Sequence, residues 1–159
     1  MKKIDPASDA ARRVFLRAVR EGDLQTFFEY QLDPESLRMV MSSSRDREAH
    51  KGHWHRILVD DSVTAVAIVF DGFVAGDIVS WDNEGEREVG YWIGRSFWGQ
   101  GIATTALAQF LEHLDRRPLR AHVAKHNVGS LRVLEKCGFA IVGESKHGDA
   151  DELVLFREG

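Results

Sequence analysis

Apolar residues in the middle of the chain follow the pattern of three consecutive strands. The runs 64–70 and 73–81 are β-prone, and an Asp-Gly pair at 71–72 between them is a signal for a two-residue hairpin turn. A second turn over residues 82–85 leads into the apolar and aromatic run 88–93. The pattern therefore predicts three antiparallel strands in a row.

From residue 102 the spacing of apolar residues becomes helical. One face of the predicted helix carries Ile102, Ala103, Ala106, Leu107, Phe110, Leu111 and Leu114. Gly99 and Gly101 stand just before it. The first N–H groups of a helix have no partner inside the helix and carry the positive end of its dipole, so such a turn favours a bound anion, most often a phosphate. A tight turn that only packs the helix closely is the alternative.

The segment before these strands reads as a strand followed by helices. Residues 14–19 predict a short strand, and Asp23 is placed to cap a helix over residues 24–32. Pro34 either interrupts this helix or begins another. A further helix is expected over residues 47–58, where the preceding aspartate is placed as its cap.

The segment after the central helix predicts two more crossings of the sheet. A strand covers residues 119–124, and a helix from Asn127 or Val128 ends at Cys137, before a glycine in the usual C-terminal position. The last strands cover residues 139–142 and 152–156. The element order is β-α-α-β-β-β-α-β-α-β-β, which indicates an α/β (α+β) fold with a mixed sheet covered by helices.

Composition narrows the class without identifying a function. The chain has 159 residues, of which 43% are hydrophobic and 29% charged, so one domain over 1–159 with a flexible tail over 1–11 is expected. The single cysteine excludes a disulfide framework. A net charge of −4 argues against a nucleic-acid surface, and no apolar run is long enough to span a membrane. The first residues lack the apolar core of a signal peptide, so a cytoplasmic location is expected.

Two segments carry a resemblance to a known family. The stretch VGYWIGRSFWGQGIATTAL (89–107) and the later stretch HNVGSLRVLEKCGFAIVGE (126–144) resemble the two motifs of the GNAT superfamily of N-acetyltransferases. Within it, they resemble the ribosomal-protein N-terminal acetyltransferase (RimJ/RimL) branch. The resemblance implies the GNAT fold, which has a mixed, mostly antiparallel central sheet of about six to seven strands flanked by about four helices.

The resemblance also implies an activity. It is the transfer of an acetyl group from acetyl-CoA to a primary amine by direct attack in a ternary complex, with no metal. A peptide or protein N-terminal α-amine is the first choice of acceptor, and a polyamine, amino acid or antibiotic is the alternative. A non-catalytic acyl-CoA-binding module of the same fold is the competing class. The chain is expected to be a monomer or homodimer.

The family's donor site maps onto this chain residue by residue. The turn amides would hold the pyrophosphate, the strand around Tyr91 would pair with the pantetheine arm, and Asn127 would contact the coenzyme near that arm. The residues implied to bind acetyl-CoA are Tyr91, Trp92, Ile93, Trp98, Gly99, Gln100, Gly101, Ile102, Ala103, Thr104, Asn127 and Ser130.

Two positions depart from the family's pattern. Trp98 stands where the phosphate turn usually has Arg or Gln, and Leu134 stands where many members have a tyrosine that protonates the leaving thiolate. Both departures favour the non-catalytic alternative. Ser130, one helical turn earlier, lies at the position where the RimL-like branch carries a serine proposed for that role, so Ser130 is the candidate general acid.

Glu88, at the head of the central strand, is the candidate general base. The alternative is that Glu88 only ends the hairpin, as one of an acidic group with Asp82, Glu84 and Glu86. An α-amine with a pKa near 8 costs roughly 3.3 kcal/mol less to deprotonate than a lysine amine near 10.4, so an α-amine demands less from this base. His50, His53 and Asp46 could share a helix face as metal ligands, but Gly52 weakens that helix, and a metal site is not expected.

Overall fold

The computed structural model describes residues 13–40, 44–114 and 118–158, so the predicted tail over 1–11 lies outside the described residues. The strands are β1 (Val14–Ala18), β2 (Thr64–Phe70), β3 (Phe73–Asn83), β4 (Glu86–Ile93), β5 (Leu119–Ala124), β6 (Ala140–His147) and β7 (Ala150–Arg157). The helices are α2 (Asp23–Gln31), α3 (Pro34–Val40), α4 (Arg47–Val59), α5 (Ile102–His113) and α6 (Val128–Lys136), with a short 3-10 helix η1 (Arg95–Phe97).

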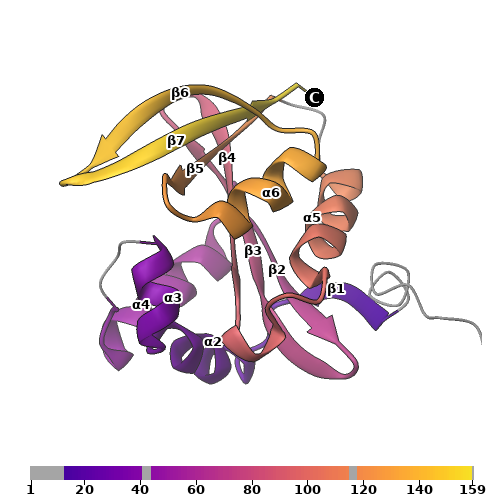
Figure 1. Ribbon diagram of the computed structural model, residues 1–159. Helices are drawn as coiled ribbons and strands as arrows, with labels where there is room; N and C mark the ends of the chain where they lie inside the picture. Colours follow the sequence, from indigo (N-terminus) through magenta and orange to yellow (C-terminus); the bar gives the residue numbers. More distant parts are fainter. Residues whose placement is uncertain (1–12, 41–43, 115–117, 159) are drawn as a thin grey trace, which may run out of the picture.

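The described strands form one seven-stranded sheet in the order β1-β2-β3-β4-β5-β7-β6 (Figure 1). All neighbouring pairs are antiparallel except β4 and β5, which run parallel. The parallel pair arises because α5 crosses over between β4 and β5, as a parallel connection requires. The predicted mixed, mostly antiparallel sheet is therefore confirmed.

Local signals placed most turns correctly. Asp71 and Gly72 both have positive φ, 52° and 81°, as a tight hairpin turn requires. Asp46 caps α4, because its carboxylate accepts a hydrogen bond from the Ala49 amide at 2.8 Å. Gly138 has φ +93° after α6, where the predicted helix-ending glycine belongs.

The predicted Asp23 cap is wrong. Gly22 occupies the N-cap position of α2 without a side-chain cap, and Asp23 is the first helical residue. Its buried carboxylate instead forms an ion pair with Arg17 at 2.7 Å and accepts from the Arg20 amide. The guanidinium holds the pKa of the Asp23 carboxyl below its usual range. A charged partner on β1 has outcompeted the helix amides for this carboxylate.

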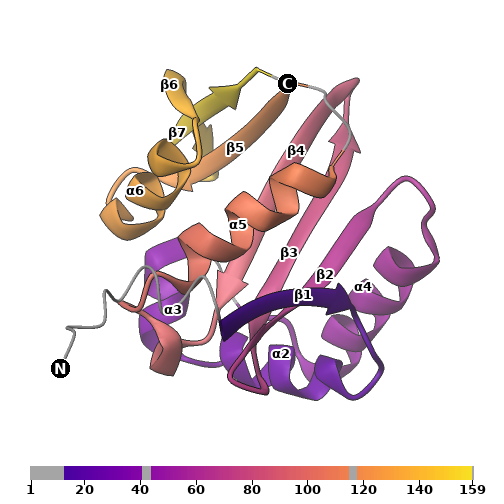
Figure 2. The same cartoon turned by 90° about the vertical axis from the view of Figure 1, so that its right-hand side faces the viewer.

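Three helices, rather than the two of the predicted order, separate β1 from β2. Pro34 begins α3 as a separate helix, which fits its fixed φ and missing N–H at a first helical position. Figure 2 shows the resulting layers, with α5 and α6 over one face of the sheet and α2 and α4 over the other. Within the described residues, no helix combines the length and apolarity needed to cross a membrane.

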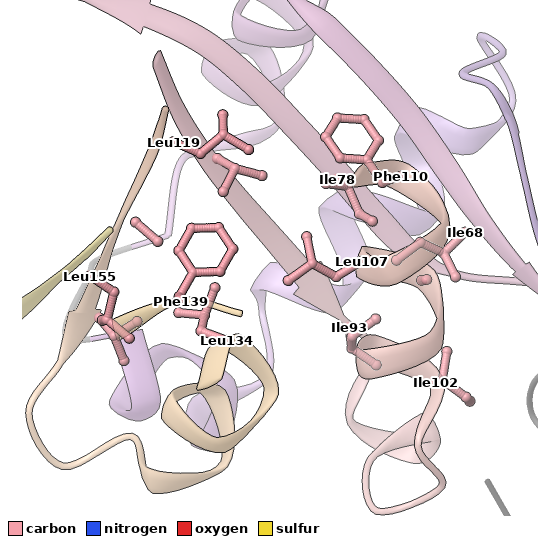
Figure 3. Packing of buried hydrophobic residues seen from close by; sticks show 14 of the residues in the cluster. Ile68, Ile78, Ile93, Ile102, Leu107, Phe110, Leu119, Leu134, Phe139 and Leu155 are labelled. Atoms are coloured by element: carbon pink, nitrogen blue, oxygen red, sulfur yellow. The ribbon is translucent and has the colours of Figure 1, made fainter. Parts of the chain in front are cut away.

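Two hydrophobic clusters hold these layers together. The larger cluster lies between the sheet and helices α5 and α6 and includes Ile78, Leu107 and Leu134, all almost fully buried (Figure 3). The smaller cluster joins Leu24 and Phe27 of α2 to Trp54 of α4 and Ala67 of β2. The helix pairs thus fix the sheet from both faces.

A half-buried carboxylate adjoins the smaller cluster. Asp77 of β3 pairs in register with Ala67 of β2 on one side and Trp92 of β4 on the other. Burial raises the pKa of the Asp77 carboxyl to about 7. Between pH 4 and pH 7 the folded protein thus retains a proton that the unfolded chain loses, and this residue makes stability fall as pH rises through that window.

Asp77→Asn is therefore expected to stabilise the fold at alkaline pH. The neutral amide removes the cost of a buried charge, so the gain over the parent chain at pH 8 should exceed that at pH 4 by at most ~4 kcal/mol. Urea denaturation at both pH values measures the difference. The same free-energy change at pH 4 and pH 8 would show that Asp77 ionises in the folded protein as it does in water.

Candidate active site

The sheet opens between its two parallel strands. β4 and β5 pair only through Arg87 with Leu119 and Glu88 with Arg120. Beyond these pairs, residues 89–93 and 121–124 line the two walls of a cleft of about 620 Å³, which we name the β4–β5 cleft. Because hydrogen-bonded pairing stops at Glu88, the edge of β4 that faces this cleft is free to bind an extended ligand.

A glycine turn lies at the end of the β4 wall. Gly99 and Gly101 have φ of +77° and +76°, which side-chain-bearing residues rarely adopt. Gly101 is the N-cap of α5, and no side chain caps the helix, so its first amides are open to an anion. The predicted anion site therefore has the required backbone geometry, and the turn borders the cleft through Gly99, Gly101, Ile102, Ala103 and Thr104.

Trp98 supports this turn. Its indole Nε1 donates to the carbonyl of Ile93 at 2.9 Å, and its ring also lines the cleft. The side chain at the family's Arg/Gln position thus fastens the turn to the end of β4. An anion at this turn would therefore meet backbone amides rather than a guanidinium.

Two hydroxyl groups meet across the cleft. The Tyr91 hydroxyl lies 2.6 Å from Ser130 Oγ and 3.4 Å from the Ser130 carbonyl oxygen. Ser130 stands in the first turn of α6, where Asn127 Oδ1 accepts from its amide at 3.2 Å. Burial raises the pKa of Tyr91 to about 12, so the phenol is protonated at neutral pH. Leu134 is buried in the core, with 2% of its surface exposed.

A histidine links two carboxylates at the other side of the cleft. His122 Nε2 lies 2.7 Å from Glu88 Oε1, and His122 Nδ1 lies 3.3 Å from Glu152 Oε2. Asn83 also donates to Glu88 at 3.0 Å, and the Glu88 carboxylate is buried. His122 and Glu152 line the cleft, whereas Glu88 lies behind them. We name these three residues the Glu88–His122–Glu152 network.

Helix α3 covers part of the cleft. Ser36, Met39 and Val40 contribute to its lining. The carboxyl end of α3 is held to the loop after β5 by His126, whose Nε2 lies 2.8 Å from the Arg38 carbonyl oxygen. An acceptor molecule in this part of the cleft would therefore contact α3, the helix whose separate existence the sequence left open at Pro34.

The structure brings most of the predicted donor-site residues together. Those that line the cleft are Tyr91, Trp92, Ile93, Trp98, Gly99, Gly101, Ile102, Ala103, Thr104, Asn127 and Ser130. Gln100 is exposed in the turn, and its side-chain amide donates to the Ser96 carbonyl oxygen at 3.4 Å. Glu88 reaches the cleft only through His122. The catalytic roles of Glu88 and Ser130 remain predictions.

Sequence reasoning selected neither Glu152 nor His122 as a site residue. β5 alternates buried and exposed positions, and this alternation turns His122 toward the solvent-accessible side. The feature that brings His122 to Glu88 is the pairing of β4 with β5, which sets Arg120 beside Glu88 and His122 two residues further along, on the same face of β5. That register cannot be read from spacing alone.

Among the described residues, no group of three His, Cys, Asp or Glu side chains is arranged to hold an ion. His50 is buried against Phe28 and Trp54. Burial lowers the pKa of His53 to about 4, so its imidazole is neutral at pH 7. The surroundings of His50 and His53 are those of structural side chains.

The family model for the acetyltransferase (GNAT) domain matches residues 13–140 of the chain. The chain belongs to the GNAT acetyltransferase family. The match covers every element from β1 to the start of β6, including both walls of the β4–β5 cleft and the glycine turn.

Named relatives agree with this assignment. A Bacillus subtilis protein described as a ribosomal N-acetyltransferase, YdaF, is 29% identical over 115 residues, which cover 67% of this chain and 62% of that protein. The structure of RimL, a ribosomal L7/L12 α-N-protein acetyltransferase in complex with coenzyme A, has a TM-score of 0.77 at 20% identity, with 92% and 94% of the chains covered. AAC(6')-Ib in complex with ribostamycin and coenzyme A also has a TM-score of 0.77 at 20% identity, with 92% and 93% covered. The two solved structures confirm the predicted GNAT fold.

Proposed function

We propose that this protein is an N-acetyltransferase that moves the acetyl group of acetyl-CoA to the α-amine of a peptide or protein. One observation carries the proposal. The cleft joins an uncapped helix start and a free strand edge at one side to a histidine held between two carboxylates at the other. The first half suits an acyl-CoA donor, and the second half suits the removal of a proton from an amine.

The residues present fit acetyl-CoA. The amides at residues 100–104 would receive the pyrophosphate, as helix starts commonly do. The open edge of β4 around Trp92 would pair with the amides of the pantetheine arm, because β5 leaves this edge unpaired. A backbone N–H of the same edge would donate to the thioester carbonyl oxygen, where negative charge develops during attack.

The Glu88–His122–Glu152 network would accept the proton of the acceptor amine. The amine nitrogen forms a bond to the carbonyl carbon, the bond from that carbon to sulfur breaks, and the nitrogen loses its proton. Each ring nitrogen of His122 lies near a carboxylate oxygen, so a proton taken up by the imidazole would be hydrogen-bonded within the network. Glu88 is then a positioning residue, since it reaches the cleft through the imidazole.

Two considerations favour an α-amine acceptor. An α-amine is neutral in about one molecule in ten at pH 7, whereas a lysine amine is neutral in about one in 2,500. A network that offers one imidazole near solvent is better matched to the easier deprotonation. The names of YdaF and RimL point to ribosomal proteins and their N-termini as acceptors of those enzymes.

A peptide panel tests this acceptor class. We expect acetylation of peptides with a free N-terminus, no acetylation of the same peptides with a blocked N-terminus and a free lysine, and slow turnover of polyamines and aminoglycosides. Mass spectrometry of the products locates the acetyl group. Preferred acetylation of lysine side chains or of aminoglycosides would overturn the α-amine assignment while leaving the acetyltransferase activity in place.

Gly101→Val should weaken coenzyme A binding by about tenfold or more, because a β-branched residue opposes the positive φ that opens the α5 amides toward an anion. Calorimetric titration with coenzyme A measures the affinity. Gly72→Val is the matched control, since Gly72 has φ +81° in a hairpin that does not line the cleft. Equal affinities of both variants would exclude the turn as the anion site.

A further inference from the structure

We propose that Tyr91 positions Ser130 for catalysis: by donating its hydrogen bond to Ser130 Oγ, it leaves the single Ser130 proton free for the sulfur of the acyl-CoA donor. The inference rests on the proposed acetyl transfer. It assigns the side chain of Tyr91 a part in the reaction, whereas the sequence motif concerns only the Tyr91 backbone.

Hydrogen-bond accounting supports this direction. A serine hydroxyl has one proton and two lone pairs, and a phenol likewise has one proton. If Tyr91 donates to Ser130 Oγ at 2.6 Å, the serine proton takes no part in the hydrogen bond between the two hydroxyl groups. The alternative acceptor for the phenol, the Ser130 carbonyl oxygen, is 0.8 Å further away, as the two distances of 3.4 Å and 2.6 Å show. The protonated state of Tyr91 that follows from its raised pKa agrees with a donor role.

The position of Ser130 also favours this role. Its amide is already bound by Asn127 Oδ1, so the hydroxyl is not needed as a helix cap. It stands in the first turn of the nine-residue helix α6, where the helix dipole stabilises developing negative charge. Tyr91, Ser130 and Leu134 all line the cleft, but the apolar Leu134 side chain, at the family's tyrosine position, has no proton to give. The Tyr91 phenol on β4 thus lies in the part of the cleft where α6 carries no tyrosine.

The proposed proton transfers balance, and water is the only further reactant that they need. When the bond from the carbonyl carbon to sulfur breaks, its electron pair stays on the sulfur, which takes the Ser130 proton to give the free thiol. The Tyr91 proton follows to Ser130 Oγ, and solvent returns a proton to Tyr91. A neutral amine releases one proton to solvent through the Glu88–His122–Glu152 network on forming the amide, so one proton is lost and one is gained. An acceptor that arrives as an ammonium releases one further proton through the same network before it attacks.

Tyr91→Phe is expected to lower kcat about tenfold to 100-fold, while the KM for acetyl-CoA changes less than threefold. Ser130→Ala should lower kcat at least as much, and the double variant should be no slower than Ser130→Ala, because the two hydroxyls act as one unit. Rates in mixtures of light and heavy water provide a readout that a structural role would not move. The curved proton inventory of the parent chain should become linear in Tyr91→Phe.

Tyr30→Phe is the matched control. The Tyr30 hydroxyl donates to the Val74 carbonyl outside the cleft, so this variant loses an equivalent buried hydrogen bond and should keep its kcat. Full kcat in Tyr91→Phe, or independent effects that multiply in the double variant, would overturn the Tyr91 assignment alone. A parent chain that binds acetyl-CoA in calorimetry and releases no thiol with any amine would overturn both this inference and the proposed function.

Discussion

His122→Ala should lower kcat about 100-fold at pH 7 with an α-amine acceptor. The substitution disconnects the two carboxylates of the network, since Glu88 lies 2.7 Å from one ring nitrogen and Glu152 3.3 Å from the other. Without the imidazole, only the small fraction of amine that is neutral in solution can attack. The initial rate of thiol release at saturating acetyl-CoA measures the loss.

The pH dependence separates this role from a structural one. Raising the pH from 7 to 9 leaves most of an α-amine with a pKa near 8 neutral in solution, so the acceptor no longer needs deprotonation before attack and the defect of His122→Ala should shrink about tenfold. His113→Ala is the matched control, because His113 is exposed at the carboxyl end of α5 and does not line the cleft. A defect of the same size at pH 7 and pH 9 would contradict a role for His122 in deprotonation.

Gly76→Ala should destabilise the fold by about 3 kcal/mol or more. A Cβ atom at Gly76 would lie 2.0 Å from the Trp92 carbonyl oxygen and 3.1 Å from the Ile93 Cα, so it meets strand backbone rather than a side chain that can move aside. Relief would require β3 and β4 to separate at the wall of the cleft. For a chain of this length, the corresponding fall in Tm is about 10 °C.

Thermal unfolding of Gly76→Ala measures this effect, and Gly90→Ala is its control. Gly90 also lies in the interior of a strand, but its added Cβ would meet only the Trp81 ring at 3.4 Å, an ordinary contact. Gly90→Ala should therefore change Tm by only a few degrees. A Tm for Gly76→Ala equal to that of Gly90→Ala would show that the close approach of β3 and β4 is not a constraint on this fold.

Local chemistry explains why most elements could be predicted from the sequence. The hairpin at Asp71 and Gly72, the cap at Asp46 and the helix end at Gly138 each depend on neighbours within a few residues. Asp23 failed for the opposite reason. Its partner Arg17 is close in sequence, but only the turn between β1 and α2 brings the guanidinium to the carboxylate, and an ion pair is stronger than a neutral cap.

The candidate site divides in the same way. The predicted donor half depends mainly on one continuous strand, turn and helix, from Val89 to His113, and its resemblance to a known motif was sufficient to select residues that the structure places around the cleft. The proton-accepting half joins β4, β5 and β7 through His122, and the Tyr91–Ser130 contact joins residues 39 positions apart. These contacts follow from where β4 and β5 stop pairing, which no local pattern encodes.

The central claim is that this cleft catalyses acetyl transfer from acetyl-CoA to an amine. The most direct test is to incubate the purified protein with isotopically labelled acetyl-CoA and a peptide with a free N-terminus, and to measure free thiol and labelled peptide together. The account predicts equal amounts of both, no label on the protein, and no product from the same peptide with a blocked N-terminus and no lysine. Binding of acetyl-CoA without thiol release for any amine offered would contradict the claim and identify a non-catalytic acyl-CoA-binding module.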